Sequence, residues 1–216
     1  MHDLIERLGI PMFIQLTLEC WNELFLLLLI VMQIGKYKDK SDELASKVKI
    51  PMTNELVIFY SAIFLYNFSN IITLIYGGQD TAASYYVMRI GVFCYYLVGA
   101  FQTVFFLEVI KTHIAKKNHY KRLERAITGF QLLEAPNLLL LLLTPFTETL
   151  YSIDAYNEYH RSWGYYVWQG ITIVTFALIG AVVLLYRKKT DQFIKRIIAV
   201  AVVFPMAGFL MSFLST

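Results

Sequence analysis

Four ionisable residues lie within long apolar stretches of the sequence, where a charged side chain is unusual and therefore informative. Glu19 and Glu23 are four residues apart, so in a helix they lie on one face. Arg89 and Glu134 lie in two further apolar stretches. A charge in hydrocarbon costs at least about 2.5–3.5 kcal/mol, so such residues normally face the interior of a helix bundle and have a partner. Their types suit an intramembrane ion pair or the lining of a ligand pocket.

We predict that Glu19, with Glu23 as a second carboxylate, pairs with Arg89. At 1.5 Å per residue, Glu19 lies about 12 Å along its helix and Arg89 about 6 Å along its own, counted from the same side of the membrane. A long arginine side chain can span that difference. Glu134 lies about 10 Å from the opposite side, so it needs another partner or carries a proton. The predicted pair has three interpretations: a structural contact, the lining of a ligand or ion cavity, and part of a proton relay.

Six apolar segments position these residues, each roughly long enough to cross a hydrocarbon core about 30 Å thick. Hydrophobic residues make up 57% of the 216 residues and charged residues 16%, whereas about 25% of a soluble domain is charged. The segments are too long and too uniformly apolar for the strands of a membrane barrel. We therefore predict an all-α, polytopic helix bundle that forms a single domain over residues 1–216. Its predicted spans are 10–34, 56–76, 85–110, 127–150, 164–186 and 197–214.

The distribution of basic residues predicts the orientation of this bundle. All but Arg7, Arg89 and Arg161 of the 19 Lys and Arg residues lie in the loops after the first, third and fifth spans. Such loops face the cytoplasm. We therefore predict a multi-pass protein of the cell membrane with its N-terminus outside. The basic loop after the third span could also contact anionic lipid headgroups.

The loop between the fourth and fifth spans combines acidic, basic and aromatic side chains. Its aromatic residues suit a belt at the membrane surface, with a ligand-facing cap as the alternative. They are Tyr151, Tyr156, Tyr159, Trp163, Tyr165, Tyr166 and Trp168. A histidine changes charge near neutral pH, so His160 could sense pH, or it is an exposed side chain bonded to the turn. Arg161 could clamp a carboxylate or phosphate, or it pairs with Asp154 or Glu158.

Other sequence features narrow the possible functions. The chain has no phosphate-binding loop, no zinc-protease histidine pair and no hydrolase nucleophile motif. His113 and His119 lack cysteine or carboxylate partners at ligand spacing, so we predict no metal site, and we expect no cofactor. Pro136 and Pro145 should bend or break the fourth span.

Short motifs follow one another from the fourth span to the sixth. They are Thr144-Pro145-Phe146, Tyr151-Ser152-Ile153-Asp154, Asn157-Glu158-Tyr159-His160-Arg161 and Tyr165-Tyr166-Val167-Trp168. In this order they resemble the seven-helix membrane sensor region that precedes diguanylate cyclase (GGDEF) or histidine kinase domains in clostridia and other Firmicutes. Asn22-Glu23-Leu24-Phe25 is similar to that family's first helix. The chain departs from the pattern at Ser162 and Met211, where the family tends to have Gly and Gln. The given sequence also ends before the family's seventh helix and output domain.

The resemblance implies a sensory domain rather than an enzyme. Such a domain would bind an extracellular or membrane-derived signal, change its helix packing and relay the change to a cytoplasmic output domain, often as a homodimer. The candidate ligand-binding residues are Glu19, Glu23, Arg89, Asn157, Tyr159, His160 and Arg161. The expected partners are the lipid bilayer and a small-molecule signal, and no nucleic acid. A small transporter or channel is the alternative, and it requires a polar path from Glu19 to Glu134; a membrane-embedded enzyme has least support.

Overall fold

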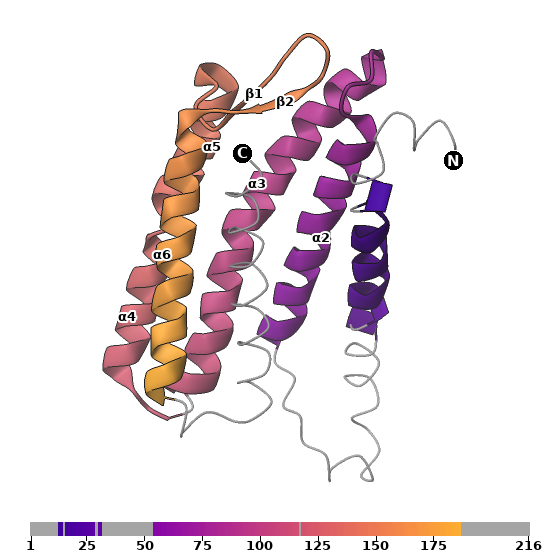
Figure 1. The fold of residues 1–216 in the computed structure, drawn as a ribbon. Helices are drawn as coiled ribbons and strands as arrows, with labels where there is room; N and C mark the ends of the chain where they lie inside the picture. Colours follow the sequence, from indigo (N-terminus) through magenta and orange to yellow (C-terminus); the bar gives the residue numbers. More distant parts are fainter. Residues whose placement is uncertain (1–12, 15, 29, 32–53, 117, 187–216) are drawn as a thin grey trace. The chain divides into compact units, whose positions relative to one another are not determined.

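The structure is a computed structural model that describes residues 13–31 with gaps at 15 and 29, residues 54–116 and residues 118–186. Most of these residues are helical (Figure 1). An uninterrupted helix at residues 16–28 is followed by α2 (Asn54–Tyr76), α3 (Ala82–Ile110), a π-helical segment (Lys111–Lys116), α4 (Lys121–Leu132), α5 (Ala135–Thr147) and α6 (Trp163–Tyr186). Two short strands, β1 (Tyr151–Ile153) and β2 (Tyr159–Arg161), form a hairpin between α5 and α6.

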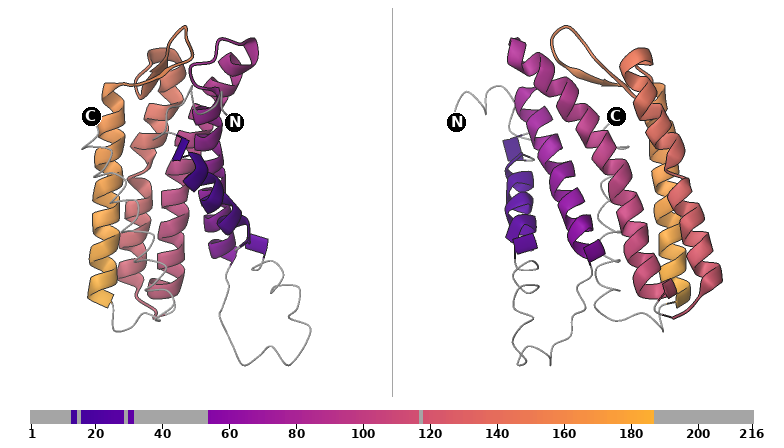
Figure 2. Two further views of the ribbon diagram at one scale, coloured as in Figure 1. Left: turned by 45° about the vertical axis from the view of Figure 1, so that its right-hand side comes forward. Right: turned by 180° about the vertical axis from the view of Figure 1, so that it is seen from behind.

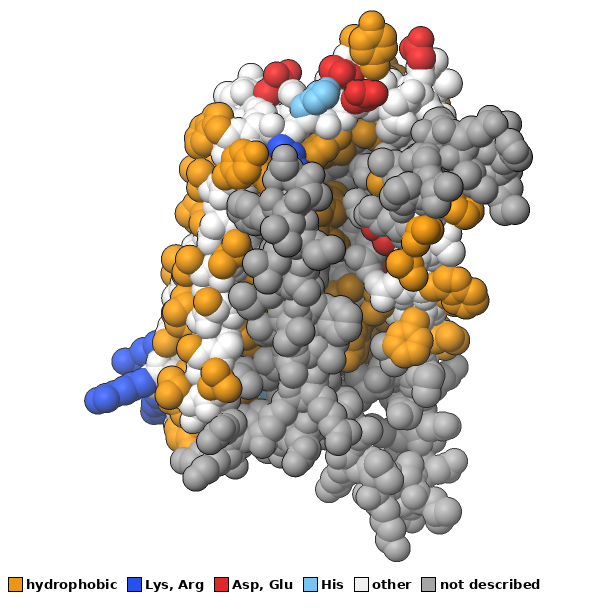
Figure 3. Space-filling view, viewed as in Figure 1, with side chains coloured by type: hydrophobic (Ala, Val, Ile, Leu, Met, Phe, Trp, Pro, Cys, Tyr) orange, Lys and Arg blue, Asp and Glu red, His pale blue; other side chains and the backbone are white. Residues whose placement is uncertain are grey.

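Four helical stretches are long and apolar enough to cross a membrane. They are Val57–Tyr76, Ala82–Lys116, Lys121–Thr147 and Trp163–Tyr186. Large apolar side chains are exposed along them, including Ile90 at 63% and Leu185 at 80%, and Figure 3 shows such side chains spread along the helices of one face. A helix satisfies its own backbone hydrogen bonds, so lipid can surround these apolar surfaces without leaving polar groups unpaired.

The predicted spans agree with the described helices where the two can be compared. The second and fifth predicted spans correspond closely to α2 and α6, and the third begins slightly later than α3. Residues 16–28 confirm helix in the middle of the first predicted span, whose ends lie outside the described residues. The sixth predicted span, 197–214, also lies outside them.

The fourth predicted span, 127–150, is broken into two helices, α4 and α5, as expected at Pro136, and α4 begins earlier than predicted, at Lys121. The amides of Leu133 and Glu134 donate to carbonyls three residues earlier, which closes α4 in a tight turn. Pro136 has no N–H with which to continue the helical ladder, so the chain breaks just before it. Pro145 lies inside α5, which ends after Thr147 with Glu148 in the left-handed conformation (φ 53°).

The described residues are mostly helical, as predicted, and the hairpin is a small departure in the stretch where a loop was expected between the fourth and fifth spans. Its turn is closed by the Asp154 amide, which donates to the Glu158 carbonyl at 3.1 Å, and by the Asn157 amide, which donates to the Asp154 carbonyl at 3.2 Å. Asn157 has φ 60°, a left-handed conformation that asparagine adopts more readily than most residues. Strands of three residues are too short for an alternating pattern to reveal them.

The chain divides into two compact units. The first contains the residues up to Gln102 together with Ser152–His160. The second contains Thr103–Tyr151 and the residues from Arg161 onward. Helix α3 runs from the first unit into the second.

In the first unit, α2 and the first part of α3 lie side by side in each view (Figures 1 and 2). The rings of Tyr66 and Tyr95 stack with centroids 4.4 Å apart, and the Tyr66 hydroxyl donates to that of Tyr95 at 2.5 Å. Gly99 allows this approach, because a Cβ there would lie 3.2 Å from the Tyr66 ring. Aromatic packing and a small residue therefore determine the spacing of these two helices.

In the second unit, α4, α5 and α6 pack around apolar side chains. Ile127, Leu141 and Ile179 are each at most 1% exposed, and they come from α4, α5 and α6 respectively. The rings of Phe106 and Phe176 lie 6.3 Å apart between α3 and α6. This packing holds the break between α4 and α5 inside the unit.

Candidate functional site

Asn157 anchors the hairpin to the turn between α2 and α3 in the first unit. Its side chain is 3% exposed. Its Nδ2 donates to the carbonyl of Gln79 at 2.9 Å and to Oγ of Ser84 at 3.4 Å, while its Oδ1 accepts from Nη1 of Arg89 at 3.2 Å. The amide of Gly78 donates to its carbonyl at 3.2 Å. Asn157 is a candidate ligand-binding residue by its sequence, and in the structure it is buried and holds the hairpin in place.

Arg89 completes the same anchor. Its Nη1 donates to the carbonyl of Tyr85 at 3.0 Å, and its Nη2 donates to that of Ile153 in β1 at 3.4 Å. The guanidinium also lies 3.6 Å from the centre of the Tyr85 ring, a cation–π distance. Arg89 therefore joins α3 to β1 and to the turn of the hairpin, and both acceptors are uncharged.

The predicted Glu19–Arg89 ion pair is absent among the residues that the structure describes. Glu19 instead accepts a hydrogen bond from Nδ2 of Asn70 at 2.8 Å. Arg89 is held by the hairpin, which the sequence analysis did not foresee, and so has partners other than a carboxylate. Glu19 and Arg89, which were predicted to pair because of their similar depth in the membrane, thus have separate partners.

Glu19 and Glu23 do share one helical face, as predicted, and that face is turned toward α2. Glu23 is 8% exposed, and neither of its carboxyl oxygens has a hydrogen-bond partner among the described residues. Asn67 of α2 approaches this carboxyl group, one turn from the Asn70 that binds Glu19. Asn67 and Asn70 are neutral, so they do not stand out in an apolar segment as charged residues do, and the sequence did not identify them.

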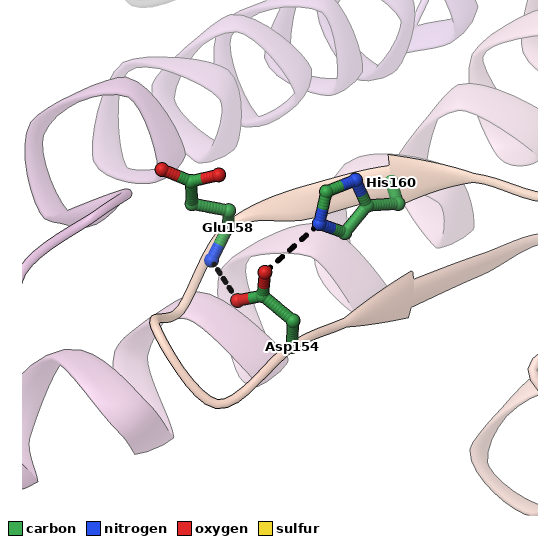
Figure 4. A group of neighbouring side chains, drawn as sticks. All are labelled: Asp154, Glu158 and His160. Carbon is green, nitrogen blue, oxygen red and sulfur yellow. Dashed lines mark hydrogen bonds and ion pairs between the residues drawn. The ribbon is translucent and has the colours of Figure 1, made fainter.

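The turn of the hairpin gathers three groups that can bind metal ions or protons (Figure 4). Oδ2 of Asp154 lies 3.0 Å from Nε2 of His160, and its Oδ1 accepts from the amides of Tyr156 and Glu158 at 2.9 Å each. The hydrogen bond from His160, followed by those from the backbone, holds the pKa of Asp154 below its usual range. The prediction that His160 could be an exposed side chain bonded to the turn matches this geometry.

Glu158 adds a third potential ligand atom, and the ligand atoms of Asp154, Glu158 and His160 all lie within 4.8 Å of one another. Carboxylate oxygen and imidazole nitrogen are common ligands of divalent ions. The prediction of no metal site considered His113 and His119 and did not consider this cluster, whose residues come together only in the folded turn. The Asx-type turn explains the position of Asp154 without any ion.

Tyr159 and Arg161 have aromatic partners. The hydroxyls of Tyr159 and Tyr96 are hydrogen bonded, which joins β2 to α3. The Arg161 guanidinium lies 4.7 Å from the centre of the Tyr165 ring in the second unit. The seven candidate residues therefore take part in several separate sets of contacts.

Glu134 occupies the break between α4 and α5 and is 1% exposed. Its Oε2 accepts from Nδ2 of Asn137 at 2.8 Å, and its Oε1 accepts from Oγ1 of Thr175 on α6 at 3.5 Å. The expectation that Glu134 has a partner other than Arg89 is thus met by an amide and a hydroxyl. Of the aromatic residues predicted to form a belt, Tyr156 and Trp163 are exposed, whereas Trp168 is buried.

No family model, curated protein or solved structure matches the chain. Three features of the chain can carry a function. They are the anchored hairpin, the carboxyl pair that faces α2, and the buried Glu134.

Proposed function

We propose that this chain is a membrane-embedded sensory domain that binds an extracellular or membrane-derived signal and relays it to a cytoplasmic output domain. The observation that supports this most directly is the Asn157 anchor. Three side-chain hydrogen bonds join the hairpin to α3, at Ser84 and Arg89, and to the turn before α3, at Gln79. The resemblance to the membrane sensor regions of cyclases and kinases points to the same function, with no cyclase or kinase activity in this chain.

The relay that we propose follows α3. The helix and the π-helical segment after it form one span of 35 residues, Ala82–Lys116. At its far end, Glu108 binds Lys111 at 2.5 Å and Lys116 at 3.0 Å. A ligand or proton that breaks the contact between Asp154 and His160 would alter the turn and shift the anchor on α3. A continuous helix can transmit such a shift over its whole length.

We also propose the finer topology that the charge distribution favours, with six spans and both ends of the chain outside the cell membrane. Asp80→Cys and Asn118→Cys variants, each in a chain with Cys20 and Cys94 replaced by alanine, test this orientation. A membrane-impermeant maleimide should label the first variant and not the second in intact cells. A tag after Thr216 should be accessible from outside, as an even number of spans requires. The reversed labelling pattern would contradict the proposed orientation.

A thermal-shift screen of the detergent-purified chain against small metabolites, divalent ions and pH tests the sensory proposal. A ligand that acts through the hairpin should raise the melting temperature of the wild type and have little effect on Asp154→Asn or His160→Gln. Glu148→Gln is the matched control, because this exposed acidic residue lies outside the hairpin and should leave the response intact.

The relay has its own readout. Hydrogen exchange of the wild type with such a ligand should slow in the hairpin and also change over Lys111–Lys116. Protection in the hairpin alone would mean binding without relay. The absence of any stabilising ligand, or equal responses in all four proteins, would count against a hairpin sensor.

A further inference from the structure

Helices α5 and α6 carry polar side chains along the faces that they bury in the second unit. On and just before α5 these are Glu134, Asn137 and Thr144, and on α6 they are Gln169, Thr172 and Thr175. All six are at most 7% exposed. Within a stretch that can cross a membrane, a row of buried polar groups is costly and usually marks a functional path.

The two rows face each other. The hydroxyl of Thr175 donates to Glu134 near one end of the pair, and the amide of Gly164 donates to the carbonyl of Thr149 at 2.9 Å near the other end. The helices are therefore antiparallel neighbours, as they also appear in each view (Figures 1 and 2). With equal rise per residue, Asn137 lies level with Thr172.

The row on α6 continues to the beginning of that helix. Nε2 of Gln169 donates to the hydroxyl of Tyr165 at 2.6 Å, whereas its buried Oε1 has no hydrogen-bond partner among the described residues. Thr144 lies at the corresponding level of α5. Buried polar groups thus recur on both helices from the end near the hairpin as far as Glu134. The hydroxyls of Thr144 and Thr172 donate to carbonyls of their own helices.

Oxygen atoms that could accept further hydrogen bonds lie near Glu134, at the break between α4 and α5. Asn137 is fully buried, and its Oδ1 has no hydrogen-bond partner within the described part of the chain. The bond from Thr175 to Glu134 is long, at 3.5 Å. Pro136 has no N–H, so the carbonyl of Leu132 four residues earlier loses its helical donor. A carboxylate, an amide and a hydroxyl are therefore in contact at the helix break.

A negative charge on Glu134 would have no counter-charge among the described residues. No Lys, Arg or His forms an ion pair with it among the described residues, and its two donors are neutral. A buried carboxylate is stable only with a compensating charge or proton. Oxygen ligands favour hard cations, and broken membrane helices place carbonyl oxygens where they can bind Na⁺. A single carboxylate balances one monovalent charge, whereas a divalent ion would leave excess charge in an apolar interior.

We propose that Glu134, Asn137 and Thr175 bind one Na⁺ ion within the membrane, and that the ion enters along the polar row between α5 and α6. This site belongs to the second unit and does not depend on the proposed sensory function. A bound ion would hold the broken span against α6, so ion occupancy would control the packing of these helices.

Thermal unfolding of the full chain in detergent tests the site. NaCl replaces choline chloride at constant ionic strength, and KCl is run in parallel. The melting temperature of the wild type should rise saturably with Na⁺, because a ligand that binds only the folded state stabilises it. Thr175→Val keeps the side-chain shape and should weaken Na⁺ binding about tenfold or more. Glu134→Gln should abolish the Na⁺ effect, whereas the control Glu124→Gln on α4 should retain it.

Two outcomes would overturn the proposal. One is a wild-type melting temperature that is the same in Na⁺ and choline. The other is stabilisation by acid alone that Glu134→Gln removes, which would mean that Glu134 holds a proton. If Glu134→Gln does not fold, the linewidth of the ²³Na NMR signal provides a second test. The wild type should broaden this signal more than detergent micelles without protein do, and Thr175→Val should broaden it less than the wild type. No broadening by the wild type would contradict Na⁺ binding.

Discussion

An Asn157→Ala variant should lose about 3 kcal/mol of stability. About 2 kcal/mol of this comes from the lost hydrogen bonds, one of which is to the charged guanidinium of Arg89. The carbonyl of Gln79 loses its donor as well. About 1 kcal/mol more comes from the backbone, because alanine at φ 60° is strained whereas asparagine tolerates this conformation.

An Asn157→Gly variant separates these two contributions, since glycine adopts positive φ without strain. It should lose about 2 kcal/mol, the hydrogen-bond part alone. Unfolding of both variants in detergent, followed by thermal melting or added denaturant, measures the difference. If both variants were as stable as the wild type, the hairpin would not be anchored through Asn157, and the relay proposed for α3 would lose its first link.

A Gly164→Ala variant should be destabilised by about 1–3 kcal/mol, the usual range for an overpacked site. A Cβ at this position would lie 2.6 Å from the carbonyl oxygen of Thr149 and 2.9 Å from its Cγ2. The nearest atom belongs to the backbone and also accepts the hydrogen bond of the Gly164 amide at 2.9 Å. The Thr149 carbonyl cannot move away without loss of that bond, so the contact between Thr149 and the start of α6 must open.

Gly129→Ala provides the matched control on α4. No atom lies within 4 Å of the position of its Cβ, and alanine in a helix interior is favoured over glycine by up to about 1 kcal/mol. This variant should therefore melt at or above the temperature of the wild type. A Gly164→Ala protein that melts as high as Gly129→Ala would show that Thr149 does not approach the start of α6 this closely.

Both predictions concern contacts of the hairpin, which local sequence patterns did not reveal. Its strands are short, and the sequence singled out Asn157 as a candidate ligand-binding residue but not as an anchor. The partners of its side chain are more than 60 residues away in the chain, at Gln79, Ser84 and Arg89. The similar depth of Glu19 and Arg89 in the membrane suggested that they form a pair. Depth does not determine which neighbouring helix or loop a side chain faces.

The apolar segments, by contrast, were determined by the sequence alone. A run of about 20 apolar residues has few alternatives to a membrane-crossing helix, because lipid excludes unpaired backbone groups. The same is true of the break before Pro136, which follows from a missing N–H, and of the common face of Glu19 and Glu23, which follows from the helical repeat.

Only the tertiary structure decided what the buried carboxyl groups contact. Glu134 meets Thr175 across 41 residues of sequence, and Glu19 meets Asn70 across 51. Charges in apolar segments are conspicuous in a sequence because they are costly, whereas the neutral amides and hydroxyls that bind them are common and carry no such signal. The sequence therefore located the carboxyl groups, and helix packing selected their partners.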